Sequence, residues 1–302
     1  MERSPEYLYR YTNIGALRYM LLPPHTIRFN PLTLMDDKTE MLSRTRDMKG
    51  VRLTKDEGQF MMISCWTDME QECLKMYRDY CNPNDHGIRI RMPVNPFSLT
   101  ENKLSLDMNN DFPELVNLTA DALAFHFGRE IPLEEIQSAK AKMKTEAPDF
   151  YQAIAEKEDE IAHRIISCMT RDVDKLLIQM KYTDSIDKLI PTVITVRPNI
   201  SYGIYESFGM NKDTSWAWQR EWRCVLWFNK FIKGHIKVDG SAESYSLPFD
   251  HYDLILDMEK LKEMEITLSP MISSEARDEV EEIVGKSGLH IPVINSQLAC
   301  DS

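Results

Sequence analysis

This sequence of 302 residues lacks the glycine-rich loops with which many proteins bind phosphates. It contains no Gly-x-Gly-x-x-Gly and no Gly-x-x-x-x-Gly-Lys segment, which argues against an ordinary Rossmann or P-loop phosphate site. No Gly-x-Ser-x-Gly segment marks the nucleophile elbow of an α/β-hydrolase. The seven histidines are dispersed and form no His-x-x-x-His pair. Chemistry in this chain therefore has to come from other side chains.

Cysteine pairs and long apolar runs are absent too. The six cysteines include no Cys-x-x-Cys pair, and although Cys65, Cys73 and Cys81 recur at eight-residue spacing, no second cluster completes a zinc site. We interpret them as reduced thiols and expect no metal site. No segment approaches the ~18 apolar residues of a membrane span, and the start Met-Glu-Arg-Ser-Pro-Glu carries no apolar signal region. These features predict a cytoplasmic protein without a membrane partner.

Net positive charge is lacking as well. The formal net charge is -12, whereas proteins that coat nucleic acid nonspecifically carry basic surfaces. The excess of acidic residues lies partly in the middle of the chain, between residues 111 and 190, and the N-terminal part is close to neutral. A local basic groove therefore remains compatible with the composition.

The N-terminal third alternates short strands and helices. Gln59–Thr67 is largely apolar, as expected of a buried central strand, whereas Gly87–Met92 alternates at period two, as expected of a half-exposed strand. Other elements predicted here are strands at Tyr7–Tyr11 and Thr26–Asn30, and helices from Thr12 or Asn13 to Leu22, from Asp36 or Asp37 to Asp47, and at Glu72–Cys81.

Residues 111–190 differ in character from the rest. Alanine, glutamate, lysine and leucine dominate, glycine is nearly absent, and apolar residues recur at helical spacing, which predicts three or four helices. The following part is expected to hold a helix capped by Ser273 or Ser274 and strands at Thr192–Arg197, Glu221–Phe228, Asp253–Leu256, Ile266–Leu268 and His290–Ile294. We predict one α+β domain over residues 1–302, with a mixed sheet split by a helical insertion at 111–190.

The densest group of chemically useful side chains is Trp216–Arg223, which holds three of the five tryptophans. If a strand begins near Glu221, Glu221 and Arg223 point to one face and Trp222 points to the core. A carboxylate at this junction can stabilise positive charge that develops on a sugar carbon, or accept hydrogen bonds from ribose hydroxyls. Gln219, two residues earlier, can contact the same ligand. The same spacing also suits a surface ion pair between Glu221 and Arg223, which is the more common arrangement.

Two residues on other expected strands could join such a site. Arg10 is flanked by Tyr9 and Tyr11, and an arginine in these surroundings suits phosphate binding, although it can equally pair with a carboxylate. Ser64, near the end of the apolar strand, could offer its hydroxyl to a site residue. A hydroxyl in a buried strand more often bonds only to the backbone.

Six stretches of the chain, taken in order, resemble a large bacterial domain family of unknown function. They are Tyr9–Thr12, Met35–Glu40, Ile63–Trp66, Met76–Tyr80 with Gly87–Ile90, Lys212 with Trp216–Arg223, and Ile266–Ser269. Together they extend over nearly the whole chain except the helical insertion. The chain departs from the family pattern by Asp36 for Asn, Lys38 and Thr39 for Pro-Phe, Tyr77 for Trp, and Gln219 for the first glutamate of a Glu-x-Glu pair.

The layout of that family is similar to that of ADP-ribosyltransferases, including DarT-like toxins that modify nucleic-acid bases. The resemblance implies an ADP-ribosyltransferase-like split sheet and NAD as the substrate. It implies that Arg10 grips the dinucleotide phosphate or the nicotinamide ribose, that Ser64 orients the site, and that Glu221 and Gln219 are catalytic. The remaining residues implied are Tyr9, Tyr77 and Trp216 at the dinucleotide, and Arg223, Trp218 and Asp37 at the acceptor.

The expected function is therefore that of an NAD-dependent ADP-ribosyltransferase, a bacterial toxin or phage-defence effector acting on a base of RNA or DNA. Three alternatives stay open. The first is a noncatalytic module that binds a nucleotide, a nucleic acid or a peptide. The second is an NAD glycohydrolase, which uses water as the acceptor, and the third is a nuclease. For a nuclease, only Asp36 and Asp37 with Glu40 hint at metal-binding carboxylates. A toxin also implies an antitoxin or chaperone partner, for which the acidic insertion is a natural docking surface.

Overall fold

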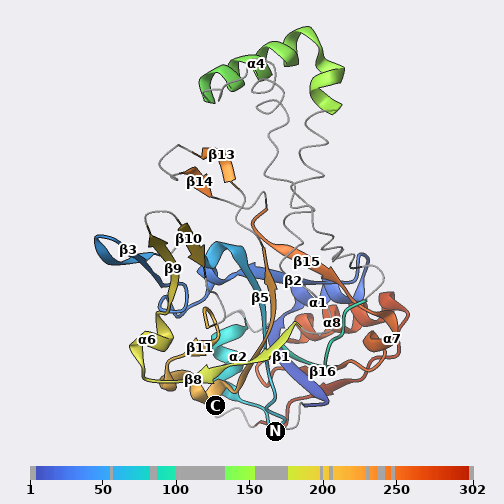
Figure 1. Cartoon of the computed structure of the whole chain (residues 1–302). Helices are drawn as coiled ribbons and strands as arrows, with labels where there is room; N and C mark the ends of the chain where they lie inside the picture. The colour runs from blue at the N-terminus through green and yellow to red at the C-terminus, as the bar shows by residue number, and fades with distance from the viewer. Residues whose placement is uncertain are drawn as a thin grey trace. The chain divides into compact units, whose positions relative to one another are not determined.

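The computed structural model describes residues 5–54, 57–81, 87–98, 102, 133–153, 176–197, 200–203, 207–228, 232–236, 242–245 and 249–298. The chain divides into two compact units (Figure 1). Unit 1 comprises Met1–Lys103, Asp172–Leu226 and Phe249–Ser302, and unit 2 comprises Leu104–Arg171 and Trp227–Pro248. The α+β class is confirmed, because unit 1 combines a mixed sheet with several helices.

The main sheet of unit 1 follows the strand order β15-β2-β5-β1-β6-β16-β17, and β12 pairs with both β5 and β7. Most neighbouring strands are antiparallel, but β16 and β17 are parallel. The strands are β1 (Tyr7–Asn13), β2 (Thr26–Pro31), β5 (Met61–Thr67), β6 (Gly87–Pro93), β7 (Leu177–Gln179), β12 (Glu221–Trp227), β15 (Tyr252–Ile255), β16 (Glu265–Leu268) and β17 (Val293–Asn295).

The strands β1 and β5 share only one paired position in the described part of the chain, Tyr9 opposite Thr67. On its other side, β1 pairs with β6 along its whole length. The prediction that Gly87–Met92 is half exposed is wrong, because β6 lies between β1 and β16. Even its Arg89 is only 6% exposed, with the guanidinium carbon 4.3 Å from the centre of the Tyr9 ring.

The helices of unit 1 begin at the residues that the sequence marks as caps. The side chain of Asn13 accepts a hydrogen bond from the backbone N–H of Ala16 at the start of α1 (Ile14–Leu21), and Ser273 does the same for α8 (Ser274–Ser287). These two helices are joined by the ion pair of Arg18 and Glu279. The other helical segments of unit 1 are α2 (Leu74–Tyr80), α6 (Ile186–Leu189), α7 (Met258–Leu261), and the 3-10 turns η1 (Leu32–Leu34), η2 (Glu57–Phe60) and η4 (Thr214–Gln219).

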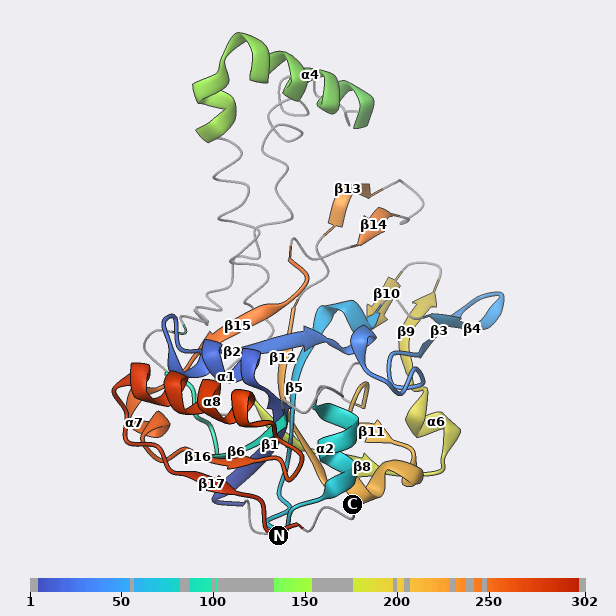
Figure 2. The same ribbon diagram turned by 180° about the vertical axis from the view of Figure 1, so that it is seen from behind.

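A second sheet has the order β10-β9-β3-β4, built from β3 (Ser43–Asp47), β4 (Gly50–Thr54), β9 (Thr192–Arg197) and β10 (Ile200–Gly203). Figure 2 shows β4 at its outer end. The prediction of a helix from Asp36 or Asp37 to Asp47 is wrong. Asp37 accepts hydrogen bonds from the N–H and hydroxyl of Thr39, which makes a tight turn in place of a helical start. Gly50, with φ of 134°, then closes the β3–β4 hairpin.

The segment 111–190 is helical only in part. In unit 2, α4 (Leu133–Glu146) and the helical residues 148–153 agree with the prediction, and the other helices expected between 111 and 175 lie outside the described residues. The prediction of helix is wrong for Leu177–Tyr182, which forms two short strands. The strand β7 pairs with β12, and β8 (Lys181–Tyr182) pairs with β11 (Asn211–Lys212). Unit 2 also holds the hairpin β13 (Ile232–Ile236) and β14 (Ala242–Tyr245). No helix in the described ranges is both long and apolar enough to cross a membrane.

Candidate functional site

A cavity of about 260 Å³ opens where β1 and β5 diverge, and we call it the β1–β5 cavity. Its walls come from β1, β5, the end of α2, the 3-10 turn η4, the first residue of β12 and the loop around Met35–Glu40. Sites for drug-sized ligands measure ~300–1,000 Å³, so this cavity suits a piece the size of one nucleoside. All of its walls belong to unit 1.

Arg10 enters this cavity from β1 and is held by one hydroxyl. Its Nη1 donates a hydrogen bond of 2.5 Å to Oγ of Ser64 on β5. The same Oγ accepts a bond of 3.1 Å from Nε1 of Trp66, whose ring centre lies 5.7 Å from the guanidinium carbon of Arg10. The hydroxyl of Ser64 thus contacts Arg10, although Ser64 itself is not among the residues that line the cavity.

No carboxylate pairs with Arg10 among the described residues. Burial lowers the pKa of Arg10, and the partial compensation comes only from the thiols of Cys65 and Cys224. An arginine remains charged at neutral pH, so this cation lies in a partly buried position without a carboxylate partner in the described part of the chain. Such a group costs free energy unless an anion binds to it. The cavity thus offers an anion-binding side chain, with several of its donors uncommitted.

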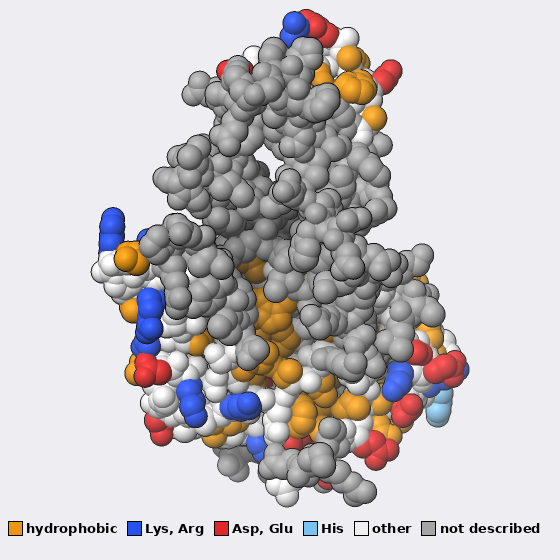
Figure 3. Space-filling view, in the orientation of Figure 1, with side chains coloured by type: hydrophobic (Ala, Val, Ile, Leu, Met, Phe, Trp, Pro, Cys, Tyr) orange, Lys and Arg blue, Asp and Glu red, His pale blue; other side chains and the backbone are white. Residues whose placement is uncertain are grey.

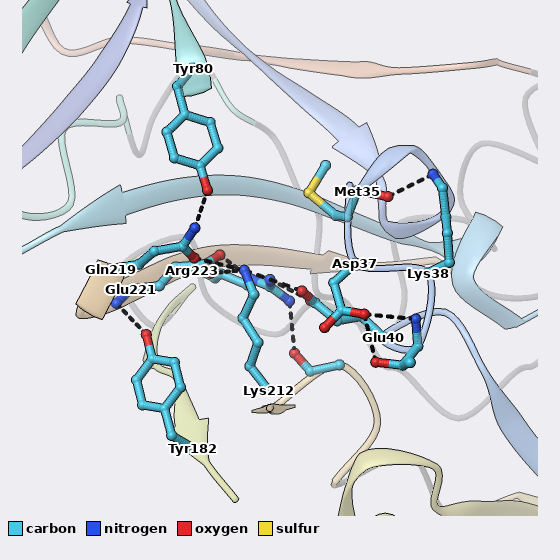
Figure 4. A network of polar contacts seen from close by, with 12 residues as sticks. Met35, Asp37, Lys38, Glu40, Tyr80, Tyr182, Lys212, Gln219, Glu221 and Arg223 are labelled. Carbon is cyan, nitrogen blue, oxygen red and sulfur yellow. Dashed lines mark hydrogen bonds and ion pairs between the residues drawn. The ribbon is translucent and has the colours of Figure 1, made fainter. Parts of the chain in front are cut away.

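Beside Arg10, the cavity meets a buried cluster of two carboxylates and two cations, drawn in Figure 4. We call it the ion-pair quartet: Glu40, Lys212, Glu221 and Arg223. Lys212 Nζ lies 2.8 Å from Glu221 Oε2 and 3.3 Å from Glu40 Oε1. Arg223 donates from Nε to Glu221 Oε1 at 2.6 Å, and its Nη2 lies 2.5 Å from Glu40 Oε2. The charges balance, which is what allows four ionised groups to be buried together.

The quartet keeps Glu221 ionised over the whole physiological range. Burial raises the pKa of a carboxyl group, but the charges and hydrogen bonds of Arg223 and Lys212 outweigh burial and bring the pKa of Glu221 down to about 2. Burial would lower the pKa of Lys212, yet Glu221 and Glu40 raise it. Glu221 is therefore a fixed negative charge in the wall of the cavity and not a proton donor at neutral pH.

The turn η4 and the strand β12 position Glu221. Asp213 caps η4 by accepting a bond from the N–H of Ser215, and Arg220 ends it in the left-handed region at φ of 45°. The chain then enters β12, and the N–H of Glu221 donates to the hydroxyl of Tyr182 at 2.7 Å. The predicted strand start at Glu221 is thereby confirmed.

Gln219 has both ends of its amide engaged. Its Oε1 accepts a bond of 2.8 Å from Lys212 Nζ, and its Nε2 donates to the hydroxyl of Tyr80 (Figure 4). With 3% of its surface exposed, Gln219 links the quartet to α2. The amide is thus held in place and faces the cavity beside Glu221.

Several predicted site residues line the cavity together with Arg10, Gln219 and Glu221. Trp216 does so, with its ring centre 4.7 Å from Lys212 Nζ. Tyr9 contributes to the wall although its ring lies against Arg89. Asp37 lies in the loop at the wall, where its carboxylate already holds Thr39.

Other predicted positions do not fit their expected roles. Tyr77 is 1% exposed and donates its hydroxyl to Glu72, so it belongs to the core beneath the cavity. Trp218 packs over Lys75 and is absent from the cavity wall. Arg223 is completely buried within the quartet, which leaves no surface for an acceptor. Trp222 was expected in the core, but it is more exposed than Glu221 and Arg223, because the charge quartet occupies the inner face of β12.

Several wall residues with side chains of chemical interest were not predicted as part of the transferase site, among them Glu40, Cys65, Trp66, Tyr80 and Lys212. Tyr80 lies on α2 one turn after Tyr77, and helical spacing on a predicted helix could have indicated it. Lys212 and Glu40 fall inside stretches that carry the family resemblance, but only their burial reveals their pairing. Burial raises the pKa of the Cys65 thiol to about 12, so this cysteine is a poor nucleophile.

No family model, no curated protein and no solved structure matches this chain. No group of three or more His, Cys, Asp or Glu side chains in the described ranges is arranged to hold a metal ion. The site is therefore interpreted from its own geometry.

Proposed function

We propose that the chain transfers ADP-ribose from NAD to an acceptor, with the β1–β5 cavity as the dinucleotide site. One observation carries the proposal: a partly buried arginine, without a carboxylate partner among the described residues, and an ionised glutamate line the same small cavity. The first suits a phosphate, and the second suits a ribose whose anomeric carbon becomes positively charged. The aromatic rings of Trp66, Tyr80 and Trp216 suit a flat ring beside them.

The chemistry needs little from the protein beyond position and charge. The bond between the ribose C1′ and the nicotinamide nitrogen breaks, and its electron pair leaves with nicotinamide. The acceptor then donates a lone pair to C1′ and loses a proton to solvent. Glu221 favours the positively charged sugar electrostatically, and Arg10 holds the phosphate so that C1′ stays near Glu221. By the sequence resemblance, the acceptor is a nucleic-acid base and the biological role is that of a toxin or defence effector.

One observation favours a second candidate, a noncatalytic nucleotide-binding module. Both carboxylate oxygens of Glu221 already accept hydrogen bonds from Arg223 and Lys212. A carboxylate whose charge is balanced in this way stabilises a developing cation less than an unpaired one. In this alternative, Arg10 and the aromatic rings bind the nucleotide and no bond breaks.

The decisive test incubates the protein with NAD labelled in its adenylate half and with separate pools of RNA, DNA and protein. A transferase moves label into one pool and releases nicotinamide, and a glycohydrolase releases nicotinamide without labelling any pool. Glu221→Gln is expected to abolish both label transfer and nicotinamide release. The matched variant Glu265→Gln, which changes a partly exposed ion pair with Arg91, should behave like the parent. NAD binding with no nicotinamide release in any pool would support the binding module and refute the transferase.

A further inference from the structure

The hairpin of β3 and β4 has a different chemistry from the rest of this acidic chain. Its segment Ser43–Thr54 contains four basic residues and one acidic residue, although the whole chain has a net charge of -12. Arg44 is paired with Asp187 on α6, and no ion pair of the other three, Arg46, Lys49 and Arg52, occurs among the described residues. Figure 3 shows Lys and Arg side chains along the edge where Figure 1, in the same orientation, places β3.

Large apolar side chains are exposed on the same hairpin. Met48, Val51 and Leu53 are 76%, 53% and 61% exposed. Opposite residues of an antiparallel pair point to the same face, so Val51 shares a face with Arg46, and Leu53 shares it with Arg44. On this face, basic side chains of β3 therefore lie beside apolar side chains of β4.

The strand β4 is also the last strand of its sheet in the described part of the chain. All of its residues from Gly50 to Leu53 are exposed. Natural proteins usually protect such an edge with a bulge, a proline or a covering loop, because its peptide groups can pair with another strand. Within Gly50–Thr54 there is no proline, and the pairing with β3 is regular.

We propose that β4 is a docking edge for an acidic, extended segment of another protein, which pairs with it as an added strand. The peptide groups at the outer edge of β4 would supply the hydrogen bonds. Val51 and Leu53 would meet apolar side chains on one face, whereas Arg52 on the other face, together with Lys49 in the adjoining turn, would meet carboxylates. A second copy of this chain fits less well, because two hairpins of the same positive charge repel one another. A nucleic acid fits less well too, since the exposed apolar residues are aliphatic and cannot stack on bases as aromatic rings do.

The test uses a fluorescein-labelled peptide of alternating glutamate and valine, titrated against the full chain and followed by anisotropy. Saturable binding is expected, with at least a tenfold loss for the double variant Lys49→Glu with Arg52→Glu. A peptide of the same sequence with alternate amides N-methylated keeps its charge but loses its strand-pairing donors, and it should bind at least tenfold more weakly. The control is Lys286→Glu, which changes an exposed basic residue on α8, far from the hairpin in sequence, and should leave the affinity for the peptide unchanged.

Three results would overturn the proposal. The first is the absence of saturation up to about 1 mM peptide, the range of the weakest specific complexes. The second is equal binding of the N-methylated peptide, which would reduce the effect to charge attraction. The third is evidence for a different occupant of this edge. Such evidence would be tighter binding of a DNA or RNA oligonucleotide, with that binding lost in the double variant. It would equally be a dimer of the chain in sedimentation that dissociates in the Leu53→Glu variant.

Discussion

At the scale of single residues, two arginines near the cavity have opposite surroundings. Arg223 lies between two carboxylates, Glu221 and Glu40, and has no exposed surface. Arg10 is partly buried and contacts Ser64 and the ring of Trp66, but no carboxylate among the described residues. We propose that the first arginine stabilises the fold and that the second binds a ligand. Their substitution should therefore have opposite effects.

We predict that Arg10→Met leaves the free energy of unfolding unchanged to within about 0.5 kcal/mol or raises it, because it removes a partly buried charge that no carboxylate among the described residues balances. The matched variant Arg223→Met should lower it by about 3–5 kcal/mol, because two carboxylates lose their cation. Urea denaturation at neutral pH measures both. Equal destabilisation by the two substitutions would show that Arg10 is as much a structural residue as Arg223.

The lowered pKa of Glu221 predicts how stability depends on pH. Its pKa is about 2 in the folded chain and 4.5 in an ordinary environment, so the group binds its proton more readily when unfolded. Its contribution, roughly 3 kcal/mol, is complete above pH ~4.5 and is lost as the pH falls towards 2. Denaturation between pH 7 and pH 3 should show this loss in the parent and much less of it in Glu221→Gln. Identical slopes in the two proteins would mean that the quartet does not hold the carboxylate as described.

At the scale of elements, the turn η4 contacts α2 through the packing of Trp218 over Lys75 and through the hydrogen bond between Gln219 and the hydroxyl of Tyr80. We predict that Tyr80→Phe costs about 1 kcal/mol of stability, the usual worth of one hydrogen bond. It should weaken nucleotide binding severalfold, because the amide beside Glu221 is no longer fixed. The control is Tyr19→Phe, whose side chain is 55% exposed on α1. Nucleotide titration distinguishes the two, and an unchanged affinity in Tyr80→Phe would exclude this positioning role.

The elements with local signals could be predicted from the sequence, and those set by distant partners could not. The strand β5 and the helices α1 and α8 follow from apolar runs and capping residues that act over a few positions. The hairpin β3–β4 was missed because Asp36 and Asp37 resemble a helix cap, whereas Asp37 forms a turn. The strand β7 was missed because its pairing with β12 joins residues far apart in the chain.

The candidate site shows the same division between local and distant signals. Residue type and order suggested Arg10 and Glu221, and both line the cavity, whereas their roles there stay predictions. The quartet could not be predicted, since Lys212 reaches Glu221, and Glu40 reaches Lys212 and Arg223, only through the fold. Trp222 was assigned to the core by the alternation of side chains along a strand, but a balanced set of charges occupies the inner face instead.

At the scale of the whole molecule, the cavity and the quartet are built entirely from unit 1. We therefore predict that replacing residues 104–171 of unit 2 with a flexible Gly/Ser linker leaves nucleotide affinity within about threefold of the parent value, since no wall residue is removed. Titration with NAD and a thermal unfolding curve check this. Loss of affinity in a variant that still unfolds cooperatively would mean that unit 2 contributes to the site.

The account depends most on Arg10 serving a nucleotide and not the fold. The most direct measurement is the rate of nicotinamide release from NAD by the parent and by Arg10→Met, at equal concentrations of folded protein and with each acceptor pool present. We predict release by the parent and at least a tenfold lower rate in the variant, whose stability is preserved. No release by the parent with any acceptor, or equal rates in both proteins, would contradict the assignment of this cavity to NAD chemistry.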